Sequence, residues 1–184
     1  MFIVIKPKPV LHGFIIWLCL SFTIVSCGQN TQETKAAPGY VLKPVGWVSD
    51  YAGVLTPGQT DSLETAQQQL EDSTGSQIAI LIIDSLPGIP LEEYTLNTFN
   101  TWGVGRKDIN DGILIVVAIF NRQMRIGVGY GLEKIITDEI AGQIIQEEMV
   151  PPLQQQNYFE GLLASVERIK QLIYQNQPLV GQRK

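Results

Sequence analysis

Acidic side chains gather in the short segments that link the apolar stretches of this 184-residue chain. Asp108 and Asp111 lie just before a long apolar run. Glu133 and Asp138 follow the glycine-rich stretch 127–131. Hard divalent cations bind several oxygen ligands, which carboxylates and the carbonyls of a glycine-rich backbone can supply. The residue types therefore favour a site for calcium, with magnesium as the alternative.

Other chemistries are poorly provided for in this sequence. The single histidine and the two cysteines lie at positions 12, 19 and 27, which leaves too few soft ligands for zinc and no histidine for a catalytic triad. The glycines of 127–131 are expected to end a strand rather than open a helix, so a nucleotide cofactor is not predicted. A formal net charge of -5 argues against a nucleic-acid partner.

A basic pair stands beside the acidic segment. Arg106 and Lys107 precede Asp108 by two positions and one position, respectively. Arginine donates paired hydrogen bonds to phosphate oxygens, and lysine adds a compact positive charge. The two residues are therefore candidates for binding a phosphate group, and the alternative is a pair of solvated surface charges.

Each acidic residue also has an ordinary structural explanation. Asp111 could shape the turn before Gly112, and Asp138 could cap a helix, because aspartate is common in both places. Clustered carboxylates repel one another unless a cation lies between them. The case for a metal site therefore depends on whether the fold brings the four acids together.

The elements that would position these residues alternate between helical and strand patterns. Thr56 and Pro57 open the first helix, and a β-branched apolar run follows it. Helices are predicted over 57–74, 91–102, 138–149 and 158–174, and strands over 77–83, 113–120 and 124–128. Pro151 and Pro152 are expected to stop the third helix. The order predicts the α/β class, as a three-layer α/β/α sandwich with a small mixed sheet.

The connections between the strands determine which loops lie at the same edge of the sheet. A helical crossover makes strands 77–83 and 113–120 parallel, and a tight hairpin makes 124–128 antiparallel to its neighbour. The start of strand 113–120 and the end of strand 124–128 then share one edge of the sheet. We therefore expect Asp108 and Asp111 to face Glu133 and Asp138 there.

The first residues have the composition of a targeting signal. Two lysines precede an apolar run over 10–25, and a small residue precedes Cys27, as in a bacterial lipoprotein signal. The run is short for a membrane span. An uncleaved signal anchor is the alternative, and either would hold the protein outside the cytoplasm, facing the periplasm or the cell surface.

Domain boundaries follow from this interpretation. The sequence predicts a lipoprotein signal peptide over 1–26, a lipidated Cys27 that begins a flexible linker over 27–44, one folded domain over 45–177, and a tail over 178–184. Lipid at Cys27 would make the membrane the first partner of the protein.

An ordered series of motifs resembles the TPM domain, the thylakoid-lumen phosphatase-like family. The motifs are VSDYAGVL at 48–55, TGSQ at 74–77, WGVGRK at 102–107, NDGIL at 110–114, RIGVGYGLE at 125–133 and TD at 137–138. The resemblance spans about residues 45–176 and implies an α/β/α sandwich that binds a divalent cation, usually calcium. It also implies that Asp50 joins Asp111 and Asp138 among the acidic ligands, a role that the topology alone does not assign to Asp50.

Two functions follow from the residues and the resemblance together. One is a membrane-anchored, extracytoplasmic module that binds a divalent cation and assists the assembly or maintenance of a membrane or envelope protein complex. The alternative is a metal-dependent acid phosphatase acting on phosphomonoesters, in which Arg106 or Lys107 would stabilise phosphate charge.

Overall fold

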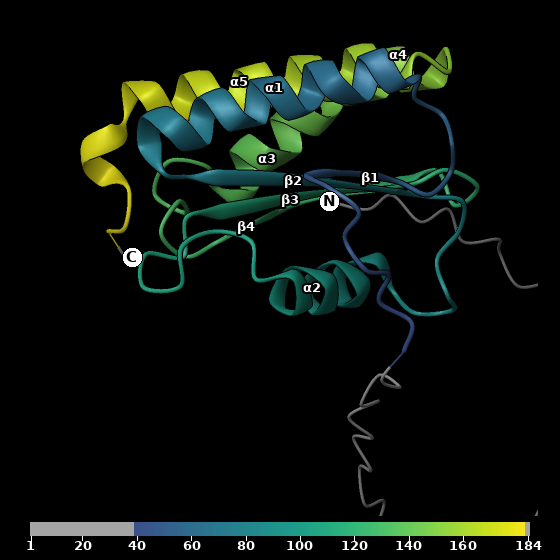
Figure 1. Cartoon of the computed structure of the whole chain (residues 1–184), viewed down its shortest axis with the longest axis horizontal. Helices are drawn as coiled ribbons and strands as arrows, with labels where there is room; N and C mark the ends of the chain where they lie inside the picture. The colour runs from purple at the N-terminus through teal and green to yellow at the C-terminus, as the bar shows by residue number, and fades with distance from the viewer. Residues whose placement is uncertain (1–38, 183–184) are drawn as a thin grey trace, which may run out of the picture. The chain divides into compact units, whose positions relative to one another are not determined.

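A computed structural model describes residues 39–182 (Figure 1). The elements in chain order are β1 (Val48–Asp50), α1 (Pro57–Thr74), β2 (Gln77–Ile83), α2 (Leu91–Trp102), β3 (Gly112–Ala118), β4 (Gln123–Val128), α3 (Asp138–Ile144), a π-helical turn (η1, Ile145–Met149), α4 (Val150–Gln154), α5 (Tyr158–Gln175) and a 3-10 turn (η2, Gln177–Leu179). The predicted signal peptide and Cys27 lie outside the described residues. Among residues 39–182, no helix combines the length and hydropathy needed to span a membrane.

One four-stranded sheet forms the middle layer of the molecule. Its order is β1-β2-β3-β4, with β1, β2 and β3 parallel and β4 antiparallel to β3. Helices α1, α3, α4 and α5 cover one face, and α2 covers the other (Figure 1). The predicted three-layer α/β/α sandwich with a mixed sheet is confirmed.

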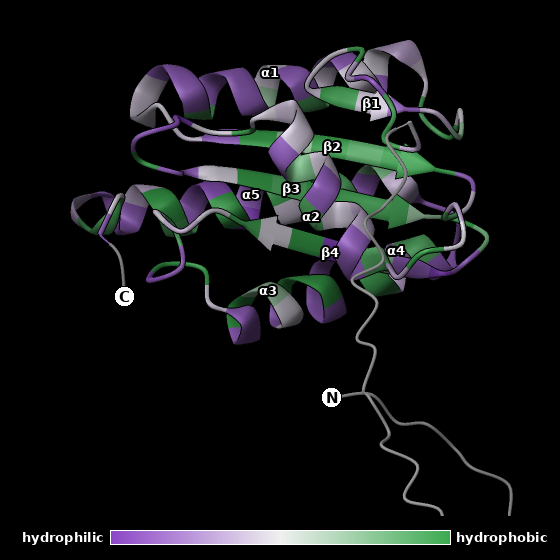
Figure 2. Ribbon diagram, turned by 90° about the horizontal axis from the view of Figure 1, so that it is seen from below, coloured by the Kyte–Doolittle hydropathy of each residue, from purple (hydrophilic) through white to green (hydrophobic). Residues whose placement is uncertain are grey.

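The apolar strands explain why both faces are covered. Along β2, Ile78, Ile80 and Ile82 belong to the core beneath α1 and α5, and Ala79 and Leu81 belong to the core beneath α2. Side chains alternate between the two faces of a strand, so an uninterrupted apolar run must be buried on both. Figure 2 shows β2 and β3 as predominantly hydrophobic and α1 as mixed. The sequence pattern alone therefore specified a middle layer.

The structure differs from the predicted elements in two places. Strand β1 was not predicted, because three residues are too few for a periodic pattern. The predicted helix over 138–149 is divided into α3 and the π-helical turn, and helical structure continues through α4 to Gln154. Pro151 and Pro152 lie in the first turn of α4, where a missing N–H is tolerated. The expectation that these prolines end the helical segment was wrong.

The last residues of the predicted linker belong to the folded unit. Trp102 Nε1 donates a hydrogen bond of 2.7 Å to the carbonyl of Leu42, and the ring of Tyr40 packs in a tilted arrangement against that of Tyr94, with centroids 6.0 Å apart. The described residues, 39–182, belong to one compact unit that contains both cores. We therefore expect a fragment of residues 37–184 to fold by itself.

Raising the pH above about 10 is expected to destabilise this fragment through Tyr94. Burial raises the pKa of the Tyr94 phenol, so folding makes its proton harder to remove. The contribution of the Tyr94 phenol to the free energy of unfolding is complete below the pKa of about 10 that it has in the unfolded chain. This contribution is lost as the pH rises through the higher pKa of the folded protein. The slope reaches at most about 1.4 kcal/mol per pH unit. Urea denaturation should show a shallower alkaline loss for Tyr94→Phe, whereas the exposed control Tyr130→Phe should match wild type. Equal slopes in all three proteins would contradict this prediction.

Candidate functional site

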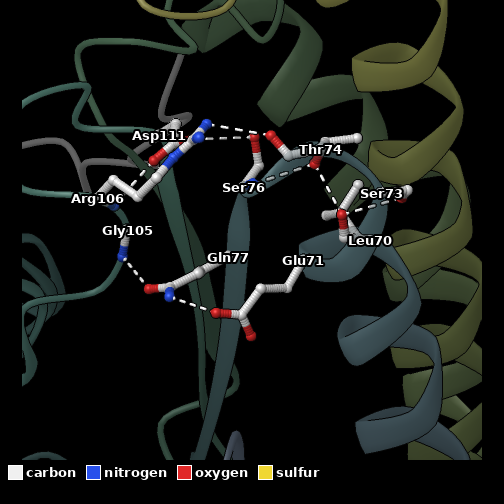
Figure 3. A network of polar contacts seen from close by, with 9 residues as sticks. All are labelled: Leu70, Glu71, Ser73, Thr74, Ser76, Gln77, Gly105, Arg106 and Asp111. Atoms are coloured by element: carbon white, nitrogen blue, oxygen red, sulfur yellow. Dashed lines mark hydrogen bonds and ion pairs between the residues drawn. The ribbon is translucent and has the colours of Figure 1, made fainter.

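Asp111 is fully buried and forms an ion pair with Arg106 (Figure 3). Its Oδ1 accepts a hydrogen bond of 2.9 Å from the backbone N–H of Arg106, and its Oδ2 accepts one of 2.9 Å from Arg106 Nε. Arg106 Nη2 and Ser76 Oγ also donate to Oδ2. Four donors from two segments therefore compensate the buried carboxylate, as a charge removed from water requires.

A second set of hydrogen bonds ties the same segments together. Gln77 Oε1 accepts from the backbone N–H of Gly105 at 2.7 Å, and Gln77 Nε2 donates to Glu71 at 2.7 Å. Arg106 Nη2 donates to the carbonyl of Thr74 at 3.1 Å. The loop before β3 is thus fastened to the turn between α1 and β2 (Figure 3). We interpret this network as a structural clamp.

A groove of about 330 Å³ lies beside this loop, between α2, β4 and the segment that leads into α3. Glu133 and Asp138 both line it, together with Asn110. Two large apolar side chains that also line it, Leu96 and Tyr130, are 60% and 66% exposed. The structure therefore brings two of the predicted acidic ligands into one groove, at the edge of the sheet where the topology placed them.

The other predicted acids lie elsewhere. Asp108 is exposed and does not line the groove. The Asp111 carboxylate points into the clamp. Asp50 ends β1, and the parallel pairing of β1 and β2 puts this end at the opposite edge of the sheet from Glu133. Within residues 39–182, no three histidine, cysteine, aspartate or glutamate side chains lie close enough together to hold a metal ion. The five predicted ligands are therefore not one cluster.

Asp50 has a local structural role. Its Oδ1 accepts hydrogen bonds from the N–H groups of Ala52 at 3.1 Å and Gly53 at 2.9 Å, and its Oδ2 accepts one from Leu55 at 2.8 Å. A short side chain that bonds to the N–H groups just after it stabilises a turn. Asp50 thus shapes the chain between β1 and α1.

The two predicted phosphate-binding residues differ in how far their side chains are already engaged in hydrogen bonds. Arg106 directs Nε and Nη2 to Asp111 and the carbonyl of Thr74. Lys107 is exposed. A phosphate that bound Arg106 bidentately would have to compete with the buried Asp111 carboxylate for the same N–H groups.

The wall of the groove contains features that the sequence pattern did not single out. Asn110 has a positive φ of 58°, and its carbonyl accepts a hydrogen bond of 2.9 Å from the N–H of Gly131. A Cβ on Gly129 would lie 2.2 Å from the same carbonyl oxygen. Glu92, on α2, reaches the groove and pairs with Arg125 at 3.0 Å. The glycine spacing was the available signal for the close approach, but Glu92 looked like any exposed helical residue.

Comparison with known proteins places these features in a family. The sequence model of the TPM domain matches residues 48–172. The solution structure of the N-terminal domain of a P. gingivalis protein is 31% identical, with a TM-score of 0.66, over 72% of this chain and 84% of that chain.

Two further solution structures share the fold at lower identity. The BA42 protein from the psychrophilic bacterium Bizionia argentinensis is 17% identical, with a TM-score of 0.59, over 66% of this chain and 82% of that chain. The N-terminal domain of the cg2496 protein from Corynebacterium glutamicum is 20% identical, with a TM-score of 0.56, over 72% and 86%. No curated protein matches the sequence.

The family match covers the parts of the chain that build the site. It begins in β1 and ends within α5, so it includes the clamp around Asp111 and every element that lines the groove. It also spans more than half of the chain. By sequence match and by fold, the chain belongs to the TPM-domain family.

Proposed function

We propose that this TPM domain binds a divalent cation, calcium in preference to magnesium, in the groove between α2, β4 and α3. The observation that supports the proposal best is that Glu133 and Asp138 line the same groove. Asn110 and Thr137 line it as well, although the Thr137 hydroxyl already accepts a hydrogen bond from the N–H of Ile140 at the start of α3. Carboxylate oxygens and the carbonyl oxygens of amides are the ligands that a hard cation prefers.

The kind of ligand that the groove offers favours calcium over magnesium. Two carboxylates neutralise the charge of one divalent ion, and the remaining positions can be filled by carbonyl oxygens and water. Magnesium demands near-ideal octahedral geometry, whereas calcium accepts irregular arrangements of ligands. A groove that offers two carboxylates and irregularly placed loop oxygens therefore suits calcium better than magnesium.

We further propose that the cation orders the loop between β4 and α3 so that the groove presents a fixed surface to a membrane or envelope protein. Lipid at Cys27 would hold the domain at the extracytoplasmic face of a bacterial membrane and keep it close to such a partner. Ligand binding stabilises the conformation that binds best, so a cation can act as a structural cofactor without taking part in any reaction.

The alternative function, hydrolysis of phosphomonoesters, has less support. A phosphate clamp built on Arg106 would require N–H groups that already bond to Asp111 and Thr74. Lys107 is the better candidate for contacting phosphate, because it is exposed and lies in the same loop as Arg106. Hydrolysis therefore enters the test below as a separate readout.

The test is a calorimetric titration of residues 37–184 with calcium, followed by an assay of p-nitrophenyl phosphate hydrolysis on the same sample. Glu133→Gln and Asp138→Asn should each weaken calcium binding at least about tenfold, because each removes one of two charged ligands. Asp108→Asn, on an exposed neighbour outside the groove, is the matched control and should bind as wild type does.

The outcomes separate the two functions. Calcium binding that depends on Glu133 and Asp138, without turnover, supports the structural role. Calcium-dependent turnover that is lost in Lys107→Ala would support the phosphatase instead. If wild type and the two groove variants bind calcium equally, or none binds it, the proposed cation site is wrong.

A further inference from the structure

A second and larger groove lies at the opposite edge of the sheet from the first. Its volume is about 600 Å³, and it is formed by the β3–β4 hairpin on one side and by α4 and the start of α5 on the other. This volume falls within the range of about 300–1000 Å³ in which proteins hold small ligands. None of the residues in the proposed cation site lines it.

The walls of this groove are mainly apolar. Ile119 and Met124 line it from the hairpin, and Val150 and Leu153 line it from α4. At its rim, Phe120 is 76% exposed, the highest value among the large hydrophobic side chains of the described residues. Phe120 lines the groove and so extends its apolar wall into a contiguous exposed patch, which is a feature of binding surfaces.

One positive charge stands in this apolar lining. Arg122 is the only charged residue that lines the groove, and no carboxylate of residues 39–182 forms an ion pair with it. By contrast, Arg106 and Arg125 each pair with an acid. The chain as a whole has a formal net charge of -5. A single unpaired guanidinium among apolar side chains is complementary to a single negative charge on an apolar ligand.

Two residues that line the groove have a left-handed backbone conformation, which is unfavourable for residues other than glycine. Arg122 has φ of 51° and Gln156 has φ of 61°, two of the three positive values outside glycine within residues 39–182. The hairpin turn requires such a residue, but glycine or asparagine would adopt this conformation more readily than arginine. Arginine therefore occupies a turn position that glycine or asparagine would fill at a lower conformational cost.

We propose that this groove binds a long-chain carboxylate, with the hydrocarbon chain along the apolar wall and the carboxylate on Arg122. The amide side chains of Gln123, Gln154 and Gln156 also line the groove and can donate further hydrogen bonds to the carboxylate oxygens. The proposal is independent of the cation site, because the two grooves share no lining residue.

The experiment is an NMR titration of isotope-labelled residues 37–184 with sodium dodecanoate below its micelle-forming concentration. We expect chemical-shift changes confined to residues 117–124 and 150–158. Arg122→Gln should weaken binding about tenfold, because it removes a charge-assisted hydrogen bond. Gln154→Glu, which adds a negative charge at an exposed position, should weaken it as well. Arg168→Gln, at an exposed arginine on α5 away from the groove, is the matched control and should bind as wild type does.

Three results would overturn the proposal. The first is the absence of shifts in both segments. The second is equal affinity for dodecanoate in wild type, Arg122→Gln and Gln154→Glu when all three remain folded. The third is equal binding of the neutral analogue dodecanol, or tighter binding of the acidic apolar peptide acetyl-Leu-Leu-Glu-amide, which would assign the groove to an uncharged ligand or to a polypeptide.

Discussion

Asp111→Ala should lower the free energy of unfolding of residues 37–184 by about 3 kcal/mol, because it removes one partner of a buried ion pair. The variant leaves Arg106 Nε, Arg106 Nη2 and Ser76 Oγ without their common acceptor. Arg106 is 42% exposed and can turn to water, which keeps the loss at the lower end of the range for buried pairs. Urea denaturation measures the change.

Asp108→Ala is the control for this prediction. Asp108 lies in the same loop but is exposed and outside the clamp, so its replacement should change stability by less than about 0.5 kcal/mol. Asp111→Asn should fall between the two, because an amide oxygen can accept one of the hydrogen bonds but carries no charge. A stability of Asp111→Ala equal to that of Asp108→Ala would contradict the structural role of the clamp.

The clamp also affects how a phosphatase test should be designed. Arg106→Ala would leave a fully buried carboxylate without its cation, so the variant should be destabilised as well. A loss of turnover in it would then report unfolding rather than phosphate binding. Lys107→Ala avoids this ambiguity, because Lys107 is exposed.

Gly105→Ala should be at least as damaging, with a loss of about 3 kcal/mol or more. Gly105 has φ of 90°, and a Cβ there would lie 2.2 Å from the backbone nitrogen of Gly112. Alanine would therefore be strained, and the start of β3 would have to move away from the loop. Circular dichroism during thermal unfolding should show a lower melting temperature.

Gly103→Ala separates the cost of the left-handed backbone from the cost of the steric clash. Gly103 also has a positive φ, of 65°, but no atom lies within 4 Å of the position that its Cβ would take. Its replacement should carry only the cost of the left-handed backbone, about 1–2 kcal/mol. Equal losses in the two variants would mean that the close approach of Gly105 to Gly112 contributes nothing.

The clamp and the cation groove are joined through one short segment. Asn110 lines the groove and holds Gly131 through its carbonyl, and the next residue is Asp111. Any change that releases Asp111 should therefore also disturb the wall of the groove. For this reason, loss of calcium binding in an Asp111 variant would not by itself identify Asp111 as a ligand.

Much of this architecture could be predicted from local pattern. The apolar run of β2 predicted a strand buried on both faces, and Thr56 with Pro57 predicted the start of α1, where a capping box is found. The crossover and the hairpin together placed Glu133 and Asp138 near the start of β3. These predictions succeed because side-chain periodicity, caps and turn residues depend on near neighbours in the chain.

The directions in which individual carboxylates point could be known only from the tertiary structure. Asp111 was predicted to face Glu133, but its partners include Ser76, 35 positions earlier in the chain. Asp50 was assigned by resemblance alone, and only the pairing of β1 with β2 places it at the opposite edge. The apolar groove that Arg122 lines is formed by the β3–β4 hairpin and α4. Helix α4 was not predicted, because Pro151 and Pro152 were expected to end the helical segment before it. A charged side chain points to whichever partner best compensates its loss of water, and that partner is set by contacts between distant segments. The sequence alone therefore determined the three layers of the sandwich and the edge of the sheet at which Glu133 and Asp138 lie. The tertiary structure decided which acidic side chains share a groove.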